Sequence, residues 1–108
     1  ALLRFGFDYW EPSEADAPAS YKGQAIEKDF DRFREEVTIL CGFHRPVWNV
    51  RGELRLEAKS IAFSEMDAED FARLYSAAID VLMRLVMRSK GFTREQLEHA
   101  VEELLRFD

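Results

Sequence analysis

The chain has 108 residues and a mass of 12.6 kDa, a size that predicts one globular domain over residues 1–108. Hydrophobic residues make up 47% and charged residues 33%, which excludes an intrinsically disordered chain, and the net charge of −6 excludes a protein that binds polyanions with its whole surface. Cys41 is the one cysteine, so no internal disulfide is expected. The sequence has no apolar stretch of the ~20 residues that span a membrane and no basic-then-apolar leader, so we expect a cytoplasmic protein that makes no membrane contact.

The first third of the chain predicts two helices separated by a loop. The apolar stretch at residues 2–10 predicts a helix that ends before Pro12, because the residue before a proline is disfavoured in α conformation. Residues 12–23 are rich in small and polar residues and predict a loop. Apolar residues then recur at helical spacing over residues 24–41, and Gly42 follows, which predicts a second, amphipathic helix.

The middle of the chain predicts a β-hairpin. Apolar and charged residues alternate over residues 54–59, which is the period of a half-buried strand. Residues 47–50 form a shorter β-prone run, and Arg51-Gly52 can supply the turn between the two strands. We expect one face of this hairpin to pack on the core and the other to be polar and basic.

A third helix is predicted after Asp67, a typical N-cap, with a buried stripe that includes Phe71 and Leu85. Further apolar residues widen this stripe, so the helix is either central to its own fold or shared with a second subunit. We expect the second arrangement, a homodimer with these residues at its interface: Ile79, Met83, Val86 and Met87. Asp80 interrupts the apolar surface, and it either faces solvent or pairs with an arginine across the subunit interface.

A last helix is predicted after residue 93. Thr93 and Gln96 have the spacing of a capping box, and the residues that follow form an apolar stripe. The predicted fold class is therefore α+β, with four helices packed with a β-hairpin.

Positive charge gathers in the predicted hairpin. Residues 43–62 carry four bases against two acids, while the segments before and after are acidic. Bases and an aromatic ring together can hold phosphates and stack a nucleobase, so we expect these residues to bind single-stranded DNA: Arg45, Trp48, Arg51, Arg55 and Lys59. The alternative is a solvated strand face whose bases pair with Glu53 and Glu57, with Trp48 in the core or in an interface.

Catalytic chemistry has little support in the sequence. Glu57 and Lys59 are two apart on one strand, as in metal-dependent nucleases, but no aspartate lies between residues 31 and 67 to complete a metal site. His44 is expected to lack a metal-binding partner, and His99 is expected on an exposed face of the last helix. We therefore expect no catalytic residue, no metal and no cofactor.

Several strings resemble a family of uncharacterised lambdoid phage and prophage proteins. The strings that carry the resemblance are FDYWEP at residues 7–12, VTI at 37–39, KSIAF at 59–63, MD at 66–67, Phe71, LYS at 74–76 and IDV at 79–81. Family members usually have additional sequence before the point that matches Ala1. The resemblance therefore implies that the chain is the C-terminal part of a longer phage protein, or a shortened relative.

The predicted order of helix, helix, hairpin and long helix is similar to that of the NinB/Orf recombination mediators of lambdoid phages. Those proteins dimerise, bind single-stranded DNA and cooperate with host single-strand-binding protein. The similarity implies a non-catalytic accessory protein of phage DNA recombination or replication that acts in the bacterial host cell. Its expected protein partner is host single-strand-binding protein or another host protein. Two alternatives are a protein-interaction module, such as an inhibitor of a host system whose acidic helices mimic nucleic acid, and a metal-dependent nuclease.

Overall fold

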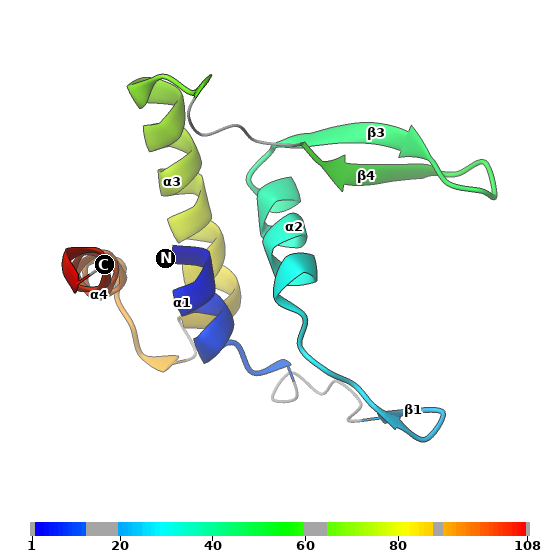
Figure 1. The fold of residues 1–108 in the computed structure, drawn as a ribbon, viewed down its shortest axis with the longest axis horizontal. Helices are drawn as coiled ribbons and strands as arrows, with labels where there is room; N and C mark the ends of the chain where they lie inside the picture. Colours follow the sequence, from blue (N-terminus) through cyan, green and yellow to red (C-terminus); the bar gives the residue numbers. More distant parts are fainter. Residues whose placement is uncertain (1, 13–19, 60–64, 88–89, 108) are drawn as a thin grey trace.

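The computed structural model describes residues 2–12, 20–59, 65–87 and 90–107, and of residues 103–107 the backbone alone. The described helices are α1 (Leu2–Tyr9), α2 (Phe30–Leu40), α3 (Ala68–Leu82) with its π-helical continuation η3 (Met83–Met87), and α4 (Arg94–Phe107). The described strands form two separate antiparallel pairs, β1 (Ser20–Tyr21) with β2 (Gln24–Ala25), and β3 (His44–Trp48) with β4 (Leu54–Ala58). In Figure 1 the β3–β4 hairpin projects from the helices. The predicted α+β class, four helices with a hairpin, is confirmed.

Side-chain caps set the starts of α3 and α4 as the sequence predicts. The Asp67 carboxylate accepts a hydrogen bond from the backbone N–H of Asp70 at 2.7 Å. Thr93 and Gln96 form a reciprocal pair: the Thr93 N–H donates to Gln96 Oε1 at 2.9 Å, and the Gln96 N–H donates to Thr93 Oγ1 at 3.2 Å. Each cap satisfies N–H groups that a helix start leaves without a partner.

The second helix is shorter than predicted. It begins at Phe30 because the Asp29 carboxylate caps it, accepting from the Arg32 N–H at 2.9 Å. The preceding residues 24–25 pair with β1 instead, across a turn in which Gly23 has a φ of 83°. A small hairpin thus joins the end of the predicted loop to the start of the predicted helix, while residues 13–19 lie outside the described part of the chain.

The core lies where α1, α2 and α4 meet α3 and η3. Its fully buried side chains are Ile79, Leu82, Met87, Leu97 and Val101. Aromatic rings extend this core toward α2: the ring centre of Phe7 lies 5.6 Å from that of Phe33. Lys28 joins the same region by donating to the backbone carbonyls of Phe7 and Trp10 at 2.7 and 2.8 Å, at the C-terminal end of α1, where a cation is favoured.

The side chains predicted to form a dimer interface belong to this core. Ile79, Val86 and Met87 are buried within the single chain, and Met83 is half-buried against them. The prediction that these four residues are exposed for a second subunit is wrong, because α1 packs on η3 and α4 packs on α3. The third helix is thus central to its own fold, the other arrangement that its sequence allowed.

The π-helical turn explains where the predicted stripe fails. In a regular α-helix Leu85 would follow Leu82 on one face, but a π-helix has i→i+5 hydrogen bonds and more residues per turn. η3 therefore places Val86 and Met87 on the same face as Leu82, and both side chains are buried. Leu85 is left exposed, and at the other end of the predicted stripe Phe71 is exposed as well.

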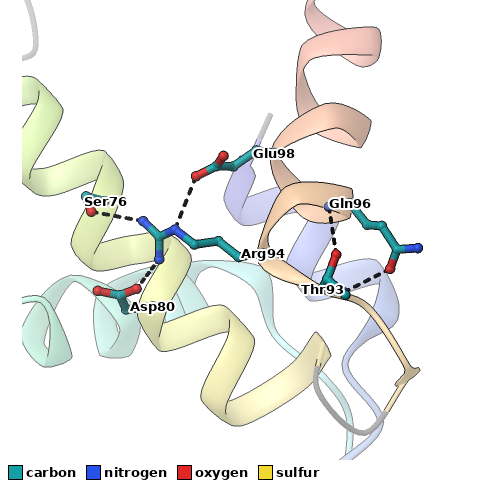
Figure 2. Close-up of polar contacts among 6 residues, drawn as sticks. All are labelled: Ser76, Asp80, Thr93, Arg94, Gln96 and Glu98. Atoms are coloured by element: carbon teal, nitrogen blue, oxygen red, sulfur yellow. Dashed lines mark hydrogen bonds and ion pairs between the residues drawn. The ribbon is translucent and has the colours of Figure 1, made fainter.

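A polar cluster on the surface joins α3 to α4 (Figure 2). The Arg94 guanidinium contacts the Asp80 carboxylate, donates to Ser76 Oγ at 3.0 Å, and lies 3.3 Å from Glu98 Oε1. Asp80 is therefore solvent-exposed and pairs with an arginine of its own chain rather than with one across a subunit interface.

Helix α1 packs closely against α3 at Gly6. A Cβ atom added at Gly6 would lie 2.7 Å from Cδ2 of Leu82, which is shorter than any ordinary carbon contact. Leu82 is fully buried, so its side chain has little room to move away. A residue without a side chain is thus required at this crossing.

We predict that Gly6→Ala lowers the free energy of unfolding by about 1–3 kcal/mol, because overpacking outweighs the helix propensity of alanine, worth about 1 kcal/mol. Urea denaturation measures this change. Leu82→Ala alone should cost about 2–5 kcal/mol. The double variant should cost less than the sum, because truncation of the Leu82 side chain vacates the space that the new methyl group needs. If the losses of unfolding free energy in the two single variants simply add in the double variant, the close contact between Gly6 and Leu82 is contradicted.

Candidate functional site

The β3–β4 hairpin holds all five residues predicted to bind DNA. Its strands pair antiparallel, with His44 opposite Ala58 at the base and Trp48 opposite Leu54 near the turn. Figure 1 shows the hairpin extending away from the helices, with α2 near its base. The predicted hairpin is confirmed, and its outer part stands clear of the core.

The turn of the hairpin is fixed by the Asn49 side chain. Asn49 Oδ1 accepts hydrogen bonds from the backbone N–H groups of Arg51 and Glu53 at 3.0 and 2.8 Å. Gly52 follows with a φ of 78°, a left-handed conformation that favours glycine. These contacts hold the turn in one shape and leave Val50 and Arg51 exposed at its tip.

One face of the hairpin is apolar, because residues opposite each other on paired strands share a face. Three large apolar side chains on it are exposed: Trp48 to 79%, Leu54 to 64% and Leu56 to 45%. The residues of this apolar face are His44, Pro46, Trp48, Leu54, Leu56 and Ala58. The prediction that this face packs on the core is wrong for its outer part, and only the base is half-buried.

The other face is charged. Its residues are Arg45, Glu53, Arg55, Glu57 and Lys59, together with Val47. Arg45 donates to Glu57 Oε2 at 2.8 Å, the ion pair that a solvated strand face predicts. Arg55 and Lys59 share this face as the alternation predicts, and neither forms an ion pair with a described residue.

The five predicted DNA-binding residues therefore do not form one surface. Trp48 lies on the apolar face, whereas Arg45, Arg55 and Lys59 lie on the charged face behind it, and Arg51 lies at the tip. A base stacked on the indole and a phosphate held by Lys59 would be on opposite sides of the sheet.

Sequence reasoning missed the exposed leucines of β4. Leu54 and Leu56 alternate with charged residues, the pattern of a strand that packs on a core, and nothing local distinguishes a covered apolar face from an open one. Pro46 in β3 could have indicated that the hairpin is not part of a larger sheet, because proline in a strand is typical of a sheet edge.

A groove of about 980 Å³ adjoins the base of β4. Its lining includes Leu56 and Ala58 from β4, Cys41 after α2, and Leu74 and Tyr75 from α3. Glu57 of β4 and Lys59 at its end line the same groove, so it adjoins the base of the hairpin on both its faces.

No metal site is built near these residues. Among the described side chains, no three His, Cys, Asp or Glu residues lie close enough together to hold a metal ion. Glu57, the carboxylate of the nuclease alternative, is held by Arg45. No helix in the described ranges is long and apolar enough to cross a membrane.

A comparison with family models decides which family the sequence represents. The model for DUF1367, a protein of unknown function, matches residues 15–107, a stretch that contains the whole β3–β4 hairpin. The chain belongs to the DUF1367 family. The expected membership of an uncharacterised family is thereby confirmed. No curated protein and no solved structure matches this DUF1367 chain.

Cys41 lies at the end of α2, where the chain turns into the hairpin. Burial raises the pKa of the Cys41 thiol, and the negative charge of Asp80 raises it further. A raised pKa lowers the fraction of thiolate at neutral pH, which makes this side chain a weaker nucleophile than a free cysteine.

We predict that iodoacetamide alkylates Cys41 at pH 8 more slowly than it alkylates glutathione, and that unfolding in urea removes the difference. Asp80→Asn should raise the rate in the folded protein, because it removes a charge that raises the thiol pKa. Ser76→Ala is the matched control, since it disturbs the same Arg94 cluster without a change of charge and should leave the rate unchanged. Equal rates in the wild type and Asp80→Asn would contradict this assignment.

Proposed function

We propose that this DUF1367 chain is a non-catalytic protein-interaction module that binds its partner with the apolar face of the β3–β4 hairpin. The observation that carries the proposal is the set of three exposed apolar side chains, Trp48, Leu54 and Leu56, on one face of a projecting element. Exposed apolar patches of this kind mark sites of protein association. Tryptophan is also the residue type enriched among those that dominate binding energy.

Charge favours a protein over a nucleic acid as the main ligand. The chain carries a net charge of −6, and Glu57 neutralises Arg45 on the charged face. The other two bases of that face, Arg55 and Lys59, lie on the opposite side of the sheet from the indole. Arg51 beside the apolar face fits a partner that has an apolar pocket with an acidic rim.

Single-stranded DNA is the second candidate ligand, and the exposed tip favours it. Trp48 is open to solvent and Arg51 lies three residues further along the turn, so a base and a neighbouring phosphate could be held there. The resemblance to lambdoid phage proteins and to NinB/Orf mediators supports this candidate. In that setting the protein would act in the bacterial cytoplasm beside host single-strand-binding protein.

The first test is capture from nuclease-treated host lysate by the immobilised protein. We predict that Trp48→Ala with Leu54→Ser lowers the captured protein at least about tenfold, because the apolar anchors are lost. Arg55→Ala with Lys59→Ala is the matched control on the opposite face and should retain it. The proposal would be contradicted if the Trp48→Ala, Leu54→Ser variant still captured the protein and the Arg55→Ala, Lys59→Ala variant did not.

The second test is a salt titration of oligonucleotide binding. If DNA binds to the charged face, Arg55→Ala with Lys59→Ala should reduce the slope of log affinity against log salt by roughly 1.4, because two phosphate contacts are lost. If it binds at the tip, Arg51→Ala should reduce the slope by roughly 0.7 and Trp48→Ala should weaken binding at every salt concentration. Wild-type protein that fails to bind at low salt excludes the DNA candidate.

A further inference from the structure

We propose that two copies of this chain pair through the outer edge of β4, antiparallel and centred on Leu56, to form a four-stranded sheet. The proposal concerns the edge of the hairpin, whereas the proposed function concerns its apolar face. It also differs from the expected dimer through the third helix, whose side chains are buried in the core.

The outer edge of β4 has backbone groups that point away from β3. In an antiparallel pair, the N–H and C=O of successive residues point alternately toward the partner strand and away from it. The hydrogen bonds from Asn49 N to Glu53 O at 2.9 Å and from Lys59 N to Phe43 O at 3.0 Å place the odd-numbered residues of β4 toward β3. The backbone groups of residues 54, 56 and 58 therefore point outward, and none of them bonds to another described backbone group.

The outer edge of β3 is closed to such pairing. Pro46 lies opposite Leu56, so its backbone nitrogen also points outward, and proline has no N–H to donate. Proline on an edge strand is a common protection against edge-to-edge association. The hairpin thus has one protected edge and one open edge, and a second copy would add to the open one.

Charge complementarity excludes two of the possible registers and fits one that is centred on Leu56. With Leu56 opposite Leu56 of the second copy, Arg55 lies opposite Glu57 of the second copy and Glu53 lies opposite its Lys59. Each charged residue on the β4 side of this face then meets an opposite charge, and the symmetry repeats both pairs. A centre at Arg55 or at Glu57 instead places like charges opposite each other, which is destabilising.

The backbone and the apolar face fit the same register. Leu56 has its N–H and C=O outward in both copies, so the two residues can exchange both hydrogen bonds across the symmetry axis. Leu54 then lies beside Ala58 of the second copy, and the two apolar faces join into one platform that carries both Trp48 side chains. A larger apolar platform is what a two-stranded hairpin lacks for stability.

The arrangement of β4 and the helical body sets where the second copy would lie. Figure 1 shows β4 running from the free tip toward α2, which lies near its C-terminal end. Antiparallel pairing carries the turn of the second copy past Ala58 toward the groove of about 980 Å³ beside α2 and α3.

The first experiment is a charge swap measured by sedimentation equilibrium. Lys59→Glu and Glu53→Lys should each raise the dimer dissociation constant about tenfold, because each creates two like-charge pairs. The double variant restores both pairs and should return to within about threefold of the wild type. A wild type that stays monomeric up to about 1 mM, or a double variant as weak as the singles, would overturn the proposal.

The second experiment tests the register directly. In a Cys41→Ser background, Leu56→Cys should give a covalent dimer on mild oxidation, because hydrogen-bonded opposite residues have Cα atoms about 5.5 Å apart, within disulfide range. Arg55→Cys is the matched control and should cross-link poorly, since residue 55 does not meet its own copy. Equal yields from both variants would overturn the register, whether or not the hairpin captures another protein.

Discussion

Packing of α1 and α4 against α3 and η3 is the constraint on which the rest of the structure depends. Leu82 meets Gly6 of α1 at a crossing that has no space for a side chain, and Met87 and Leu97 are fully buried in the same core. The long apolar helix is thereby covered within one chain. The outer half of the β3–β4 hairpin extends beyond this helical core, and its large apolar side chains are exposed to solvent.

Some features of the hairpin favour association with another chain, whereas others stabilise it within a single chain. Exposed apolar side chains such as Trp48 and an open strand edge both favour association, and two strands alone are marginally stable in water. Asn49 stabilises the turn, Arg45 and Glu57 join the strands, and Pro46 closes one edge. These contacts hold the hairpin in shape while its apolar face stays exposed, which is the physical basis for the proposal that this face binds a partner.

Local signals in the sequence predicted most elements correctly. The caps at Asp67 and at Thr93 are set by hydrogen bonds within three residues, and the alternation over residues 54–59 defines a strand on its own. What covers an apolar face depends on distant parts of the chain. The buried state of Ile79 and the open state of Leu54 could therefore not be told apart from their spacing, and the π-turn that exposes Leu85 shifts the register without any local mark.

Amide hydrogen exchange in β4, followed by NMR at two protein concentrations, tests the central claim most directly. The account predicts that at low concentration the inward amides of Arg55 and Glu57 are protected while the outward amides of Leu54, Leu56 and Ala58 exchange rapidly. At high concentration the outward amides should become protected as two edges pair. Outward amides that are protected equally at both concentrations would show that the chain itself covers this edge, and would contradict the account.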